Sequence, residues 1–183
     1  MSIIYIWYII IKSKGRVELK EFYILGKEKN KDIVENSAKY IKDLRKYSKL
    51  TQERFCDLYH IPYSTLRDWE NDRRKPTPYL IELMWTRVVL DFEHASKSRE
   101  RNDVSSVREF YLIDKIPDGE ICDKTREISR ELRKTANLSQ DGFGQLYHIP
   151  SPTISAWELQ KNSLTPYLAE FLYTRVMLDF KNN

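Results

Sequence analysis

Apolar side chains recur every three to four residues over much of the chain, as they do in helices that bury one face. Between residues 32 and 47 this spacing is kept by Ile33, Val34, Ala38, Ile41 and Leu44. Residues 121–134 follow the same pattern less regularly. We therefore expect an amphipathic helix in each of these two segments.

The first part of the chain has a different pattern. Residues 3–12 and 16–25 are rich in β-branched and aromatic side chains and are separated by Ser-Lys-Gly, which predicts a β-hairpin. Residues 3–11 are apolar on both alternating faces, so this strand requires burial on both sides. Because residues 108–113 resemble the second hairpin strand, we expect the strands to meet in one shared sheet.

The chain repeats itself with a period of 88 residues. Residues 21–92 align without a gap with residues 109–180, and 30 of the 72 pairs are identical. Such a period is too long for a solenoid and indicates two small domains. The expected fold class is mainly α with a small β-sheet. It consists of tandem duplicated domains of four to five helices, each preceded by a β-strand, plus an extra N-terminal strand. The expected boundaries are 1–92 for the hairpin and first domain, 93–107 for a linker, and 108–183 for the second strand and domain.

Local signals divide each copy into further helices. Thr51 and Ser139 occupy positions suited to the N-cap of a second helix. Phe55 and Leu58, with their counterparts in the second copy, are expected to face inward. The sequence Tyr-His-Ile-Pro then predicts a turn whose proline opens a third helix, and Thr-Pro at 77–78 and 165–166 opens a long fourth helix.

The distribution of charge along the chain indicates which part of it would attract a nucleic acid. The formal net charge is +4. Residues 21–92 hold 14 Lys or Arg against 12 Asp or Glu, whereas residues 109–180 hold 8 against 11. If the partner is nucleic acid, phosphate attraction should act mainly through the first copy and the N-terminal arm.

The sequence gives little support for a metal site, a disulfide framework, a catalytic site or a membrane segment. Two Cys and three His without metal-ligand spacing predict neither a zinc site nor a disulfide framework. The sequence has no catalytic cluster or Gly-rich phosphate loop, so we expect no enzymatic activity, no cofactor and no metal. The apolar run at 3–11 is too short to span a bilayer as a helix and lacks signal-peptide flanks. We therefore expect a cytoplasmic protein.

The combined motif resembles the Cro/repressor-type (XRE-family) helix-turn-helix proteins. It consists of Leu-Arg-Lys, Leu-Thr-Gln with Phe three residues on, Ile-Pro, Thr, Trp-Glu and Arg-Lys-Pro, at positions 44–76. The resemblance extends to both copies apart from their strands, and is strongest to phage, mobile-element and antitoxin-type regulators. It implies that the third helix, here called the reading helix, lies in the major groove of DNA.

The resemblance also implies DNA-contacting residues. In the first copy they are Gln52, Tyr63, Ser64, Arg67, Asp68, Asn71, Arg73, Arg74 and Lys75. In the second copy they are Gln140, Ser151, Thr153, Ser155 and Lys161. The second copy has lost most of the positive charge of the first. Two alternatives therefore stay open for it, a second DNA contact and a scaffold or protein-binding half.

A charged pair occurs in both copies, Arg45 with Glu70 and Arg133 with Glu158. The resemblance implies a partly buried ion pair that holds the reading helix to the first helix. The leading functional hypothesis is a sequence-specific regulator of transcription, a repressor, that binds double-stranded DNA as a covalent pseudo-dimer. The alternative is a protein-interaction factor or phage-type inhibitor that reuses the fold. A homodimer and a protein partner for the second copy or the sheet are left open, and no membrane partner is expected.

Overall fold

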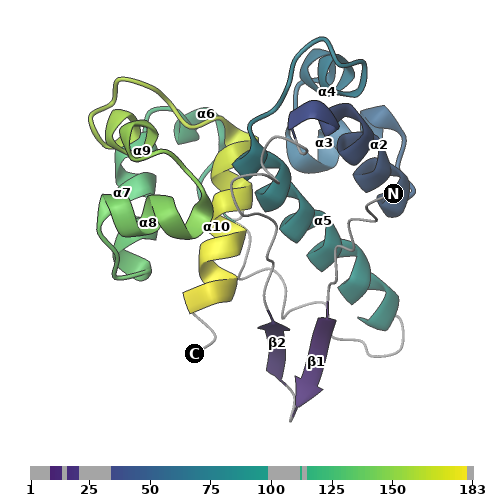
Figure 1. Ribbon diagram of the computed structural model, residues 1–183, viewed down its shortest axis with the longest axis horizontal. Coiled ribbons are helices and arrows are strands. Elements are labelled where there is room, and N and C mark those ends of the chain that lie inside the picture. The colour runs from purple at the N-terminus through teal and green to yellow at the C-terminus, as the bar shows by residue number, and fades with distance from the viewer. Residues whose placement is uncertain (1–8, 14–15, 21–33, 99–111, 113–114, 181–183) are drawn as a thin grey trace.

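The computed structural model describes residues 9–13, 16–20, 34–98, 112 and 115–180, which contain two short strands and nine helices (Figure 1). Strands β1 (Ile9–Ser13) and β2 (Arg16–Lys20) pair antiparallel, with Ile9 opposite Lys20 and Ser13 opposite Arg16. All other regular structure in the described residues is helical.

The predicted fold class is wrong, because the packed body of the protein is all-α. No described strand joins β1 and β2 in a larger sheet. The carbonyl of Leu112, at the place of the predicted second-copy strand, instead accepts hydrogen bonds from the backbone N–H groups of Lys115 and Ile116. These local bonds form a turn. The rest of that strand, and residues 3–8 and 21–25 of the predicted hairpin, lie outside the described residues.

Residues 34–98, here called the N-terminal region, form four helices. These are α2 (Ser37–Ser48), α3 (Gln52–Tyr59), α4 (Tyr63–Glu70) and α5 (Pro78–Ser98). Helix α5 extends beyond its expected end, so that residues 93–98 of the predicted linker are helical.

Residues 115–180, the C-terminal region, form α6 (Asp118–Ile121), α7 (Thr125–Thr135), α8 (Gln140–Tyr147), α9 (Ser151–Glu158) and α10 (Pro166–Phe180). Helices α7 to α10 each begin 88 residues after α2 to α5. Equivalent positions in the two regions can therefore be compared residue by residue.

The local signals explain most of the helix starts. The Thr51 and Ser139 side chains accept hydrogen bonds from the backbone N–H groups of Arg54 and Gly142, as predicted for N-caps. Phe55 is fully buried, also as predicted. The prediction that Leu58 and its counterpart Leu146 face inward is wrong, because both side chains are exposed. The tyrosine one residue later takes the inward position in each region.

The two regions share one apolar core. Helices α5 and α10 lie side by side at its centre (Figure 1), and residues 80–90 of α5 and 168–178 of α10 are buried apart from the half-buried Trp85 and Arg175. Trp69 and Trp157 are buried. Trp69 also packs edge-on against the ring of Tyr167 in α10, with centroids 5.8 Å apart. Helix α4 thus rests on residues of both regions.

Candidate nucleic-acid interface

Helices α3 and α4 are joined by a tight turn at His60. This residue is the C-cap of α3 and has φ 54°, in the left-handed region that non-glycine residues seldom adopt. The backbone N–H of Ile61 then donates to the carbonyl of Cys56 at 3.1 Å, and Pro62 opens α4. The inward face of α4 is fixed by Leu66 and Trp69, so its opposite face points away from the core.

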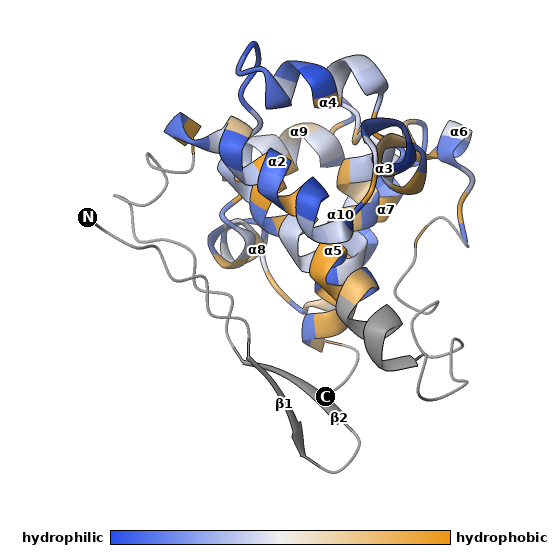
Figure 2. Ribbon diagram, turned by 90° about the vertical axis from the view of Figure 1, so that its right-hand side faces the viewer, coloured by the Kyte–Doolittle hydropathy of each residue, from blue (hydrophilic) through white to orange (hydrophobic). Residues whose placement is uncertain are grey.

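The outward face of α4 is polar and exposed (Figure 2). Tyr63, Ser64 and Arg67 are exposed, whereas Asp68 is half-buried. Arg67 makes no ion pair with any described residue. Its guanidinium is therefore available for a hydrogen-bonded contact with a base edge or a phosphate.

A basic loop follows α4 and folds back onto its end. The backbone N–H groups of Arg73 and Arg74 both donate to the carbonyl of Asp68. The guanidinium of Arg73 lies 3.9 Å from the Asp68 carboxylate, too far for a strong contact, and its side chain is 65% exposed. Lys75 bonds to the Val34 carbonyl at 3.2 Å. The loop thus presents cations beside α4 while its backbone is held in place.

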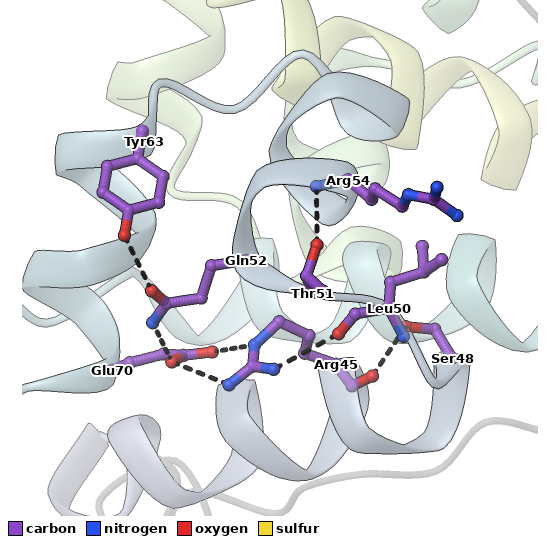
Figure 3. Close-up of polar contacts among 8 residues, drawn as sticks. All are labelled: Arg45, Ser48, Leu50, Thr51, Gln52, Arg54, Tyr63 and Glu70. Carbon is purple, nitrogen blue, oxygen red and sulfur yellow. Dashed lines mark hydrogen bonds and ion pairs between the residues drawn. The ribbon is translucent and has the colours of Figure 1, made fainter.

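Four side chains brace α4 against α2 and α3 (Figure 3). Arg45 donates from Nε to Glu70 Oε1 at 2.6 Å and from Nη2 to Glu70 Oε2 at 3.1 Å. Gln52 Nε2 donates to the same carboxylate at 2.6 Å, and Tyr63 donates to Gln52 Oε1 at 3.1 Å. Arg45 also reaches the Leu50 carbonyl. Glu70 is only 3% exposed, so its charge is compensated inside the protein.

The resemblance implies that Gln52 touches a phosphate and braces the reading helix, and that Tyr63 reaches a base edge. Gln52 does brace α4, through Glu70, and Tyr63 joins the same network through Gln52. Their sequence positions gave no sign of the bond between them, because the two residues lie in different helices. The expectation that they also contact DNA stays a prediction.

The C-terminal region repeats the brace but not the outward charge. Arg133 donates to both oxygens of Glu158, at 2.8 and 3.2 Å, and Gln140 donates to the same carboxylate at 3.0 Å. Arg130 adds a more distant contact at 3.6 Å. The Tyr63 position is Ser151, whose hydroxyl donates to Asp141 instead.

The outward face of α9 is nearly neutral. Ser155 and Ala156, which are half-buried, replace Arg67 and Asp68, and Thr153 is also half-buried. The loop after α9 offers the exposed Lys161 as its single cation. Leu159, at the start of this loop, is exposed. The two regions therefore share a scaffold and differ on the surface that would meet a partner.

The cysteines do not form a site. Burial raises the pKa of the Cys56 thiol to about 11, so it is protonated at neutral pH and is a poor nucleophile. Cys122 is exposed and forms no disulfide. Among the described residues, no group of three or more His, Cys, Asp or Glu could hold a metal ion, and no helix is long and apolar enough to cross a membrane.

Two helices joined by this turn, with a braced second helix that exposes a polar face, define a helix-turn-helix segment. Residues 41–84, from α2 to the first part of α5, match the helix-turn-helix family HTH_3. The match indicates DNA as a partner. It does not extend to the C-terminal region, so a second helix-turn-helix is not detected there. Searches of curated proteins and of solved structures found no match to the chain.

Proposed function

We propose that this protein is a sequence-specific binder of double-stranded DNA that regulates transcription, with α4 as its reading helix. The observation that carries the proposal is Arg67. It is exposed on the outward face of α4, has no ion-pair partner in the described residues, and stands beside a basic loop. A braced helix with an available guanidinium is suited to the major groove, where arginine recognises guanine through two hydrogen bonds.

Helix α4 would contact the bases of the DNA, and the loop that follows it would contact the phosphates. Arg67 and Ser64 in α4 would reach base edges, with Asp68 beside them. Asn71, Arg73, Arg74 and Lys75 in the loop would contact phosphates, which fixes the position of the protein without reading the sequence.

The C-terminal region would act as the second half of a covalent pseudo-dimer. In both views α4 and α9 lie toward the same, upper end of the molecule (Figures 1 and 2), as contact with one duplex requires. Helix α9 would contribute a weaker contact through Ser151, Thr153 and Ser155, with Gln140 and Lys161 near the phosphates. A bound pseudo-dimer would repress by occupying its operator.

Selection of bound duplexes from random DNA tests the proposal. Arg67→Ala should relax base preference at one position by roughly 1 to 3 kcal/mol. Arg73→Ala should weaken all duplexes alike and lower the slope of affinity against salt by about one ion. The matched variants Ser155→Ala and Lys161→Ala should have smaller effects. Equal losses on selected and random duplexes for both arginine variants would refute base reading by Arg67.

The second candidate is a protein-interaction factor. It is favoured by the nearly neutral outward face of α9, by the exposed Leu159 at the C-cap of that helix and by the exposed Leu146 in α8. Binding to DNA through phosphates falls steeply with salt, whereas an apolar protein contact does not. Failure of the parent protein to bind any duplex, together with salt-tolerant capture of a purified partner, would replace the first candidate by the second.

A further inference from the structure

Two histidines at equivalent positions link the regions to each other. His60 ends α3 and His148 ends α8, and both have φ 54°. His60 Nδ1 lies 2.6 Å from Oδ2 of Asp118, at the start of α6. His148 Nδ1 lies 3.0 Å from Oε2 of Glu82, in α5. Each histidine therefore crosses from its own region to a carboxylate of the other.

The positions of these histidines allow the two contacts to affect how α4 and α9 are placed. Each stands at the left-handed residue of the turn, which sets the angle between the two helices it joins. His60 thus holds α4 relative to the C-terminal region, and His148 holds α9 relative to the N-terminal region. The two contacts are reciprocal, because each histidine reaches a carboxylate of the other region. The two carboxylates are not at equivalent positions, since Glu82 lies in the long helix α5 and Asp118 in the short helix α6.

The contact of His148 with Glu82 is the more buried of the two. The Glu82 side chain is 9% exposed, and this burial raises the pKa of its carboxyl group. The charge of Asp179 also raises this pKa, whereas the hydrogen bond from His148 and the charge of Arg175 lower it. A carboxylate removed from water is costly unless a charged donor meets it. His148 Nδ1, at 3.0 Å, and the charge of Arg175 are the groups that meet it here.

The contact of His60 lies in an acidic hollow. Glu53 and Asp57 of α3 line it together with Tyr63 and Asp118. The second carboxylate oxygen of Asp118, Oδ1, is buried and has no hydrogen-bond partner among the described residues. Glu53, Asp57 and Asp118 thus place three carboxylates in the hollow that His60 also lines.

We propose that His60 and His148 are positioning residues that form a pH-sensitive latch between the regions and set the placement of α4 relative to α9. Histidine is the side chain whose charge ordinarily changes between about pH 5 and pH 8. With both imidazoles charged, each contact is an ion pair. As the pH rises and the imidazoles lose their charge, the latch weakens and the relative placement of α4 and α9 becomes less restricted.

The distance between the two surfaces can be measured without DNA. Spin labels at Arg74→Cys and Lys161→Cys, both exposed, would report the separation of the loops after α4 and α9 by pulsed electron paramagnetic resonance. Cys122→Ser removes the exposed native thiol, and Cys56 is buried. We expect a narrow distance distribution at about pH 6 that broadens at about pH 8.

The matched control is the double variant His60→Gln, His148→Gln, because glutamine retains a hydrogen-bond donor and cannot gain a charge. Its distribution should be equally broad at both pH values while circular dichroism shows unchanged helix content. A parent distribution that does not change with pH would overturn the latch. So would the same pH-dependent broadening in the double variant.

The consequence for DNA rests on the proposed function. Parent affinity for a selected duplex should fall between pH 6 and pH 8 by about fivefold more than that of the double variant, as in a weak allosteric coupling. An equal fall in both proteins would show that the histidines do not position the DNA-binding surface. If no duplex binds at all, the proposed function fails, and the spin-label distances still decide whether the latch exists.

Discussion

Glu70 is the residue on which the stability of the candidate interface depends most directly. It accepts hydrogen bonds from Arg45 and Gln52 and is almost inaccessible to water. Glu70→Ala would leave Arg45, whose side chain is 20% exposed, without its carboxylate. We expect a loss of roughly 3 kcal/mol in the free energy of unfolding, at the lower end of the range for a broken buried pair. Thermal unfolding followed by circular dichroism measures it.

Arg73→Ala is the matched control at the residue scale. This side chain is largely exposed, and its contact with Asp68 is long. The free energy of unfolding should change by less than about 0.5 kcal/mol. If Glu70→Ala melts at the same temperature as Arg73→Ala, the bracing network does not stabilise the fold.

Glu158 should give the C-terminal region a defined pH dependence. Burial alone would raise its pKa, but hydrogen bonds from Arg133 and Gln140 and the charges of Arg133 and Arg130 hold it below the ordinary 4.5. A group with a lowered pKa contributes stability above its ordinary value, and this is lost as the pH falls through the folded value. Glu158→Gln should therefore cost roughly 1 to 3 kcal/mol at pH 7 and progressively less below about pH 4.5. Urea unfolding across this pH range measures the difference, and a cost independent of pH would contradict the argument.

At the scale of elements, replacing each of the two glycines in α8 by alanine should change the free energy of unfolding in opposite directions. A β-carbon at Gly142 would meet Ser139 Oγ at 3.4 Å, an ordinary contact, so Gly142→Ala should stabilise by up to about 1 kcal/mol through helix propensity. A β-carbon at Gly144 would lie 2.5 Å from the Ile149 carbonyl oxygen, which is backbone in the turn. Gly144→Ala should therefore destabilise by roughly 1 to 3 kcal/mol. Chemical unfolding of both variants measures this, and a loss of similar size at Gly142 would show that the turn is not the cause.

The elements that the sequence predicts well are those with local causes. Thr51 and Ser139 mark helix starts because an N-cap is satisfied within three residues. The paired Arg45 and Glu70 could be placed together because the same pair recurs 88 residues later within a recognisable motif. The shared sheet failed for the opposite reason. Strand-like composition at 108–113 indicates only a propensity, and Leu112 instead takes part in a turn with Lys115 and Ile116.

At the scale of the whole molecule, the sequence predicts two copies but not how they pack. The contacts between them join residues far apart in the sequence, such as His148 with Glu82, 66 positions away, and Arg175 with Thr86, 89 positions away. No local pattern records such pairs. The predicted linker between separate domains also suggested looser units than the common core of α5 and α10. The domain boundaries themselves stay a prediction.

The common core implies that the two regions unfold together, and Arg87 offers the sharpest test. It is buried in α5, where it contacts Asp91 in its own helix and donates to Glu170 and Thr174 of α10 at 2.5 and 2.8 Å. Its counterpart Arg175 donates to Asp179 in its own helix and, across the interface, to Thr86 at 3.3 Å, and its side chain is more exposed, at 16% against 5% for Arg87. Arg87→Ala should therefore cost roughly 3 to 5 kcal/mol and Arg175→Ala less, roughly 1 to 3 kcal/mol.

Tryptophan fluorescence can follow each region separately. Proteins that retain only Trp69 or only Trp157 report on the N-terminal and C-terminal regions, and two-state unfolding requires their transitions to coincide. Arg87→Ala should lower both midpoints equally, because removal of the guanidinium from Glu170 weakens the interface on which both regions depend. A shifted transition at Trp69 with an unchanged one at Trp157 would mean that the regions fold independently. The placement of α4 relative to α9 would then depend on the histidine contacts and on the packing of Trp69 against Tyr167.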